Sequence, residues 1–287
     1  MSCTICQATD QKLIRIGKID KTGYECNACS FVFLWPQPTE KEIEDIYKES
    51  YYKSWGVFAG EEKQETARLK KGTSERYLKR VMMHRRSGKL LDIGSAFGYL
   101  MEVAKSYGFD AYGVELSSFS SSIAKKKFGS KVFEGKLKDA NFPEAHFDVI
   151  TMFDLIEHIP QPVEFMREVK RIIKPGGFVG ITTPDTSSLS YKLLGKGGWF
   201  HWKFDHLGYF NRKSIEGLAQ CTGFTLVEKK RAFKTMSFQY LLDQFRMFPH
   251  PVFSPLLRFL DRVIPKSLKH RTFSISGGEM FVILKAD

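Results

Sequence analysis

Residues 90–98, with the sequence LLDIGSAFG, decide the fold class. The first five form a short apolar run that ends at Gly94, which is typical of a buried strand in a parallel sheet. A helical pattern follows at 99–107, so Gly94 and Gly98 lie in a tight turn between a strand and a helix. Glycines let the backbone approach a ligand closely, and open α/β sheets bind ligands at the carboxyl ends of their strands. The stretch therefore predicts an α/β fold with a ligand site at its first turn.

The rest of the chain continues this alternation of strands and helices. The apolar runs predict further strands at 111–115, 131–135, 147–153, 178–184, 224–230 and 278–286. Helical patterns at 118–128, 162–172 and 213–222 lie between them. Such alternation argues for a mostly parallel sheet with helices on both faces. Residues 184–211 and 232–272 interrupt it, and we expect these two insertions to form a cap over the site.

The composition is that of a globular protein. Of the 287 residues, 43% are hydrophobic and 26% are charged, which excludes a disordered tail, a fibre and a coiled coil. No run reaches the roughly 18 uncharged apolar residues that a membrane-spanning helix needs. The N-terminal residues MSCTICQATDQK lack an apolar core. We therefore expect no signal peptide and a cytoplasmic location.

Four of the five cysteines have the spacing of a zinc site. Cys3, Cys6, Cys26 and Cys29 read C-x2-C-x19-C-x2-C, and two such knuckles place four thiolates around one tetrahedral ion. Four cysteine ligands leave no open coordination position, so the metal would be structural and not catalytic. Disulfides or unused thiols are the alternative. Cys221 lies in an apolar helical pattern and is expected to be buried.

Three segments are expected along the chain. Residues 1–38 should form the zinc ribbon, which ends at the two prolines of WPQP at 35–38. Thr39 and Glu42 have the spacing of a capping box, so a helix should begin there. A helical linker is expected over 39–86, with an aromatic stretch at 50–60 and a charged helix at about 61–86. The main domain would occupy 87–287.

A carboxylate follows the second expected strand. Glu115 lies 17 residues after Gly98, where an acidic side chain can accept hydrogen bonds from both hydroxyls of a ribose. The dinucleotide fingerprint G-x-G-x-x-G fails because position 96 is alanine. A phosphate-binding P-loop fails as well, because no G-K-[ST] follows. The motif that remains is D-x-G-x-x-x-G at 92–98, followed by the acidic residue Glu115. A tight turn without a ligand is the alternative explanation of this motif.

Four motifs together resemble class I S-adenosylmethionine-dependent methyltransferases. They are DIGSAFG at 92–98, GVELS at 113–117, FDVITMFDLIEH at 147–158 and IKPGG at 173–177. The resemblance covers about 89–231, in the order and spacing of that family. The D-x-x-E-H at 154–158 and WKFDHLGYF at 202–210 are similar to the branch that contains ubiquinone-biosynthesis and sugar O-methyltransferases. The resemblance implies a Rossmann-like seven-stranded methyltransferase sheet with an N-terminal zinc ribbon and a helical cap insertion.

The resemblance also implies which residues hold S-adenosylmethionine. Glu115 would bind the ribose hydroxyls, Leu116 would flank the adenine, and Phe153 would lie beside the sulfonium. The full implied set is Asp92, Gly94, Ser95, Phe97, Gly98, Glu115, Leu116, Leu137, Phe153 and Asp154. Where the family often has an acid near the adenine amino group, this chain has Gly-Lys-Leu at 135–137, so backbone contacts would have to serve there.

Four residues are candidates for the chemistry. Methyl transfer from a sulfonium is a direct displacement, so a base that takes the proton of a hydroxyl acceptor is the main chemical aid. His158 and His206 are the candidates, with His206 slightly favoured because it follows an aromatic segment at 199–204. Structural histidines are the alternative. Asp154, Glu157 and His158 could instead hold a divalent metal that polarises the acceptor hydroxyl.

The motifs favour a small-molecule or glycan acceptor over nucleic acid. Methylation of base amino groups usually comes with an N-P-P-Y-like tetrapeptide, where this chain reads DLIE at 154–157. Residues 1–60 carry seven basic and eight acidic side chains. The ribbon therefore lacks the net positive charge that favours binding to the phosphates of RNA. We predict methyl transfer to a hydroxyl of a sugar, a lipid-linked molecule or a natural product. An rRNA or tRNA methyltransferase and a non-catalytic cofactor-binding protein remain as alternatives.

The net charge of +12 is concentrated near the C-terminus. Residues 229–271 carry ten basic and two acidic side chains. Within them, 245–271 mix basic and apolar side chains with prolines, a pattern that fits a peripheral contact with an anionic membrane or a site for an acidic, lipid-linked acceptor. A packed helical hairpin with a solvated basic face is the alternative. No feature of the sequence indicates an oligomeric state.

Overall fold

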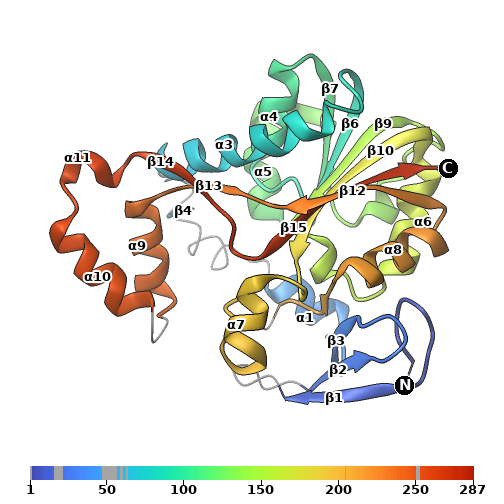
Figure 1. Ribbon diagram of the computed structural model, residues 1–287. Coiled ribbons are helices and arrows are strands. Elements are labelled where there is room, and N and C mark those ends of the chain that lie inside the picture. Colours follow the sequence, from blue (N-terminus) through green and yellow to red (C-terminus); the bar gives the residue numbers. More distant parts are fainter. Residues whose placement is uncertain are drawn as a thin grey trace.

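A seven-stranded mixed sheet forms the centre of the protein (Figure 1). The computed structural model describes residues 2–15, 22–46, 57–58, 61–62, 64–203, 205–249 and 253–287. The strand order is β12-β15-β10-β9-β6-β7-β8. Their bounds are β6 Gly88–Ile93, β7 Phe109–Glu115, β8 Val132–Glu134, β9 Phe147–Phe153, β10 Ile173–Pro184, β12 Phe224–Arg231 and β15 Glu279–Ala286. Neighbouring strands from β8 to β10 are parallel, and β15 is antiparallel to both β10 and β12. The predicted seven-stranded α/β fold is confirmed.

Helices cover both faces of this sheet. Leu90 packs with α3 (Gln64–Val81), α4 (Tyr99–Ser106) and α5 (Ser118–Phe128), whereas Leu91 packs with α6 (Pro162–Ile172) and α8 (Arg212–Cys221). Adjacent strand residues point to opposite faces, so a continuous apolar run is what a strand covered on both sides requires. Short 3-10 turns at 129–131, 137–140 and 156–158 complete the connections.

The prediction that Cys221 is buried was wrong. It is the last residue of α8 and is exposed. The buried face of α8 consists of Ser214, Ile215, Leu218 and Ala219, and position 221 lies off that face.

The N-terminal ribbon shares a sheet with the first insertion. β1 (Gln11–Arg15), β2 (Thr22–Cys26) and β3 (Val32–Trp35) are followed by β11 (Gly208–Tyr209), which pairs antiparallel with β3. The helix α1 (Glu40–Ile46) begins at the predicted capping box, where Glu42 accepts from the Thr39 backbone N–H at 2.7 Å. Most of the expected aromatic stretch at 50–60 lies outside the described residues; β4 (Val57–Phe58) pairs antiparallel with β5 (Glu61–Glu62).

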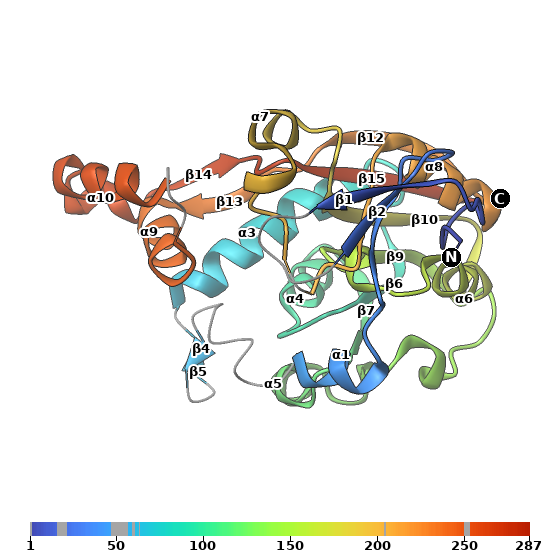
Figure 2. The ribbon, with the colours of Figure 1, turned by 90° about the horizontal axis from the view of Figure 1, so that it is seen from below.

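The two insertions are built from different elements. The first contains α7 (Leu189–Gly198) and β11. The second was predicted at 232–272. Its strands and helices span residues 234–275, which are called the arm here: β13 (Lys234–Ser237) and β14 (Thr272–Ile275) form an antiparallel ribbon that carries α9 (Phe238–Met247), α10 (Phe253–Val263) and α11 (Lys266–Lys269). Figures 1 and 2 show the arm extending away from the sheet. Within the described chain, no helix is long and apolar enough to cross a membrane.

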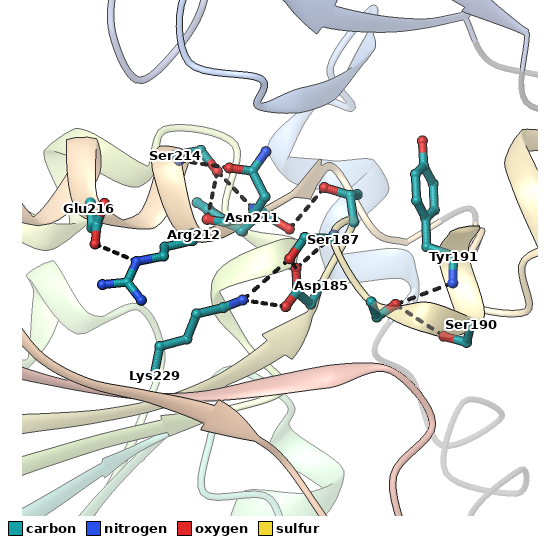
Figure 3. A network of polar contacts seen from close by, with 12 residues as sticks. Asp185, Ser187, Ser190, Tyr191, Asn211, Arg212, Ser214, Glu216 and Lys229 are labelled. Carbon is teal, nitrogen blue, oxygen red and sulfur yellow. Dashed lines mark hydrogen bonds and ion pairs between the residues drawn. The ribbon is translucent and has the colours of Figure 1, made fainter. Parts of the chain in front are cut away.

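Polar contacts fix both ends of the first insertion (Figure 3). At its start, the Lys229 Nζ on β12 lies 2.6 Å from Asp185 Oδ2, while the Ser187 backbone N–H donates to Asp185 Oδ1 at 2.8 Å. At its end, Asn211 caps α8 by accepting from the Ser214 N–H at 3.0 Å and returns its own N–H to the Ser214 hydroxyl. The insertion is therefore tied by polar contacts to β12 at its start and to α8 at its end.

Candidate functional site

The turn after β6 and the end of β7 form one cradle. Gly94 has φ 75° and Ala96 has φ 45°, so the turn uses the left-handed backbone conformation. The Glu115 carboxylate holds it closed: Oε2 accepts from the Ala96 N–H at 2.8 Å and Oε1 accepts from the Ser117 N–H at 2.9 Å. These contacts place an acidic group and the glycine turn at the same edge of the sheet.

Two buried polar groups lie in the floor of this cradle. Asp92 accepts a hydrogen bond from Thr151 Oγ1 at 2.8 Å, and burial, aided by the nearby charge of Glu115, raises its pKa to about 7. The buried Ser95 hydroxyl has no hydrogen-bond partner among the described residues. A Cβ at Gly113 would lie 2.7 Å from that hydroxyl, so glycine keeps the space beside it open. An unpaired buried hydroxyl is costly unless a ligand pairs with it, and the cradle therefore fits a polar cofactor.

A single cavity of about 2120 Å³ extends from the cradle. A pocket for one drug-sized ligand has roughly 300–1,000 Å³, so this cavity has room for a cofactor and an acceptor together. Its wall includes most of the predicted cofactor residues: Asp92, Gly94, Ser95, Glu115, Leu116, Leu137, Phe153 and Asp154.

Phe97 and Gly98, the other two residues implied for the cofactor, make packing contacts beside the turn. Phe97 is buried and packs against Tyr99 and Phe119, with ring centroids 5.8 and 6.2 Å away. A Cβ at Gly98 would come within 2.8 Å of the Phe128 ring. Both residues therefore support the turn from behind, because α4 and α5 pack closely there.

The two candidate histidines are brought together from distant segments. His158 follows β9, His206 lies just before β11, and their ring centroids are 4.8 Å apart. His158 Nδ1 lies 2.8 Å from the Asp205 carbonyl oxygen; because a carbonyl can only accept, Nδ1 carries the proton and Nε2 is the basic nitrogen. Burial lowers the pKa of both rings, and for His206 the neighbouring His158 lowers it further. Both histidines are therefore neutral near pH 7.

Glu157 lies beside this pair as a buried acid. Burial and the charge of Asp154 raise its pKa to about 8, and its Oε2 has no partner in the described part of the chain. One ligand atom from each of Glu157, His158 and His206 lies within 4.8 Å of the other two. If a metal binds here, these three would hold it. Asp154, expected in that set, belongs instead to an ion-pair network.

Asp154 leads into a polar network that the sequence did not reveal. Its Oδ2 lies 2.8 Å from Lys234 Nζ, which also contacts Glu279 Oε1 at 2.9 Å, and Thr182 donates to Asp154 Oδ1 at 2.9 Å. Desolvation would raise the pKa of Asp154, but Lys234 and Thr182 together hold it below its usual range. Asp154 is thus an ion-paired anchor in the cavity wall and a poor base.

Lys234 was missed because it belongs to the charge surplus at 229–271, for which the sequence pattern indicated a contact surface for an anionic partner or, alternatively, a solvated face. Two of its ten basic residues instead serve inside the fold, since Lys229 pairs with Asp185 and Lys234 pairs with Asp154. No local sequence pattern distinguishes these two lysines from surface lysines. Only the tertiary structure shows that each of them faces a carboxylate.

The four N-terminal cysteines converge as predicted. Cys3 Sγ lies 3.6 Å from Cys29 Sγ, and Cys6 Sγ lies 3.5 Å from Cys26 Sγ. All four sulfur atoms lie within 4.8 Å of one another, and none forms a disulfide. A tetrahedral Zn²⁺ with Zn–S bonds of about 2.3 Å requires sulfur separations of roughly 3.8 Å. The cluster fits a structural zinc ion.

Comparisons with known proteins agree with this geometry. A family model described as a methyltransferase domain matches residues 62–229, more than half of the chain. The chain is 31% identical over 111 residues to a ubiquinone biosynthesis O-methyltransferase of Thiobacillus denitrificans, covering 37% of this chain and 48% of that protein. It is 27% identical over 165 residues to the enzyme of the same name from Paraburkholderia phymatum, covering 51% and 68%. The first of these matches thus spans about half of the relative's length.

A solved structure shows the same fold at low sequence identity. An S-adenosylmethionine-dependent methyltransferase from Thermotoga maritima superposes with a TM-score of 0.54 at 18% identity, covering 87% of this chain and all of that one. This likeness agrees with the seven-stranded sheet, and the family match over more than half of the chain decides the assignment. The chain belongs to the class I S-adenosylmethionine-dependent methyltransferase family.

Proposed function

We propose that the protein transfers the methyl group of S-adenosylmethionine to a hydroxyl of a small-molecule or glycan acceptor. One observation carries this proposal: the cavity that begins at the cradle of Gly94 and Glu115 also contains the neutral histidines His158 and His206. A donor and an acceptor can therefore occupy one cavity with a base beside them. The relatives named as O-methyltransferases support a hydroxyl acceptor.

In this proposal the cradle residues hold the cofactor. Glu115 presents a carboxylate to the ribose, and the unpaired Ser95 hydroxyl offers a donor and an acceptor in the floor. Leu116 and Leu137 supply apolar wall on either side of the adenine. S-adenosylmethionine brings a methyl group that its sulfonium already activates. Holding two reactants in line can lower a barrier by roughly 7–11 kcal/mol, and this is the main task of the chain.

His158 is the better candidate for the base. Its tautomer is fixed by the Asp205 carbonyl, and the Asp205 carboxylate, 3.7 Å from the same nitrogen, can stabilise the ring once it accepts a proton. His206 lies edge-on against it and is buried at 4% exposure, so it positions His158 more readily than it reaches an acceptor. A positioned base contributes about 10²–10⁴-fold to a rate.

Calorimetric titration with S-adenosylmethionine tests the cradle. Glu115→Gln keeps the shape of the side chain but removes its charge, and we expect at least a tenfold weaker affinity. Asp110→Asn is the matched control, because Asp110 lies on the same strand and pairs with Lys131 at the surface. Equal affinities of wild type and Glu115→Gln would refute the ribose assignment.

Mass spectrometry with isotope-labelled methyl donor and a metabolite extract tests the transfer itself. A labelled product should appear with wild-type protein. The rate of formation of this product should fall by about 10²–10⁴-fold with His158→Gln, while the affinity for the cofactor stays unchanged. His146→Gln, which changes a partly exposed histidine beside Lys89, is the control. Full activity in His158→Gln would rule out its role as the base.

A further inference from the structure

Exposed apolar side chains gather on the arm. Among the described residues, eight large apolar side chains between 247 and 275 are each 40–62% exposed. They are Met247, Phe248, Leu256, Phe259, Val263, Leu268, Phe273 and Ile275. Single exposed apolar residues are ordinary, but a cluster of this kind marks a contact surface. The family model ends at residue 229, so this element lies outside the shared domain.

The helix α10 concentrates this surface on one face. Leu256, Phe259 and Val263 are spaced three and four residues apart, so they lie on the same side of the helix. Their exposures are 50%, 62% and 58%. In a helix that only packs on its own protein, such an apolar face would be turned inward. Here it is turned towards solvent.

Basic side chains surround the apolar face. Residues 246–271 contain six Lys or Arg and one acidic residue, Asp261. Asp261 is engaged by Lys269 and lies 3.4 Å from Arg246. The remaining exposed cations are Arg258, Arg262, Lys266 and Arg271. An amphipathic helix with a basic rim is the pattern of a helix that lies in the interface of an anionic bilayer.

The cavity opens on this same surface. Met247, Phe248, Leu256 and Ile275 are at once exposed and part of the cavity wall. Part of the opening therefore lies among the apolar side chains of the arm; Trp35 and Leu193, which are also exposed and line the cavity, lie at another part. Figure 2 shows the arm extending beyond the sheet, with its base strand β13 beside α3. A surface lying against this face would lie against the mouth of the site.

We infer that the arm, through the exposed face of α10 and its neighbours, docks on the surface of an anionic lipid bilayer. The apolar stripe enters the boundary between headgroups and acyl chains, and the basic rim pairs with lipid headgroups. The cavity mouth then faces the bilayer, where a lipid-linked acceptor would be presented. The docking does not depend on methyl transfer, whereas the lipid-linked acceptor rests on the function proposed above.

Vesicle flotation tests the docking with the full-length protein. The vesicles contain phosphatidylcholine, either alone or with about one third phosphatidylglycerol. We expect binding to the anionic vesicles at low salt and a large loss at roughly 1 M salt, where the Debye length falls to about 3 Å. Phe259→Asp should weaken binding at least tenfold. Arg258→Ala should weaken it about fivefold, since one basic residue near such a surface contributes about 1 kcal/mol.

Met83→Asp is the matched control, because Met83 is 72% exposed and follows α3 away from the arm. It should bind like wild type. Cofactor affinity, measured on the same samples, should be unchanged in all three variants. The docking is overturned if wild type does not float with anionic vesicles, or if Phe259→Asp floats equally well. It is also overturned if sedimentation shows that the patch instead joins two copies of the chain.

Discussion

Replacing Glu157 by glutamine should change how the stability of the protein depends on pH. The Glu157 side chain is 1% exposed, and burial followed by the charge of Asp154 raises its pKa from 4.5 to about 8. The folded protein therefore keeps this carboxyl protonated near pH 7, whereas the unfolded chain ionises it. The stability that the neutral carboxyl contributes is fully present below pH 4.5 and is lost as the pH rises towards 8. Glutamine has the shape of the neutral acid but does not titrate.

The size of the effect follows from proton linkage. Between the two pKa values, the unfolding free energy of the wild type should fall by about 1.4 kcal/mol per pH unit relative to Glu157→Gln. From pH 5.5 to pH 8 the difference between the two proteins should grow by roughly 3 kcal/mol. For a chain of this length, 3 kcal/mol corresponds to a shift in Tm of about 6 °C.

Urea unfolding at several pH values measures this difference. Trp199 and Trp202 are buried, so their fluorescence reports the transition. Glu144→Gln, which removes an exposed carboxylate, is the control for the general effect of net charge. If the difference in unfolding free energy between wild type and Glu157→Gln stays constant from pH 5.5 to pH 8, Glu157 is ionised in the folded protein. The account of a neutral acid beside the histidines would then be wrong.

Three further changes test other parts of the structure. Gly113→Ala would place a Cβ 2.7 Å from atoms of the cradle, so stability should fall by about 1–3 kcal/mol and cofactor affinity should fall with it in calorimetry. Cys26→Ser should lose the zinc that metal analysis finds near one equivalent in wild type, while the exposed Cys221→Ser keeps it. Lys234→Met would leave the buried Glu279 without its cation, and urea unfolding should show a loss of about 3–5 kcal/mol.

The local pattern of the sequence was enough to predict the strands of the sheet and the residues of the cradle. Strands β6, β7 and β9 begin and end within a few residues of their predicted bounds, and α6 spans the predicted 162–172. The turn at Gly94 and the carboxylate of Glu115 meet as expected, because the carboxyl ends of neighbouring parallel strands share one edge. These features depend on side-chain periodicity and turn chemistry, which act over a few residues.

The remainder of the site was decided by tertiary structure alone. His158 and His206 come from segments 48 positions apart in the sequence, and they meet because the segment before β11 lies against the turn at 156–158, where the Leu207 N–H donates to the Glu157 carbonyl at 2.7 Å. Lys234 on β13 pairs with Asp154, which follows β9 and lies 80 positions earlier in the sequence. Such contacts depend on strand order and on how the insertions pack, and a periodic pattern carries no information about which distant segments a buried charge will face. The residues of the cradle could therefore be predicted from sequence, whereas the contacts that bring His158, His206 and Lys234 together in the cavity wall could not.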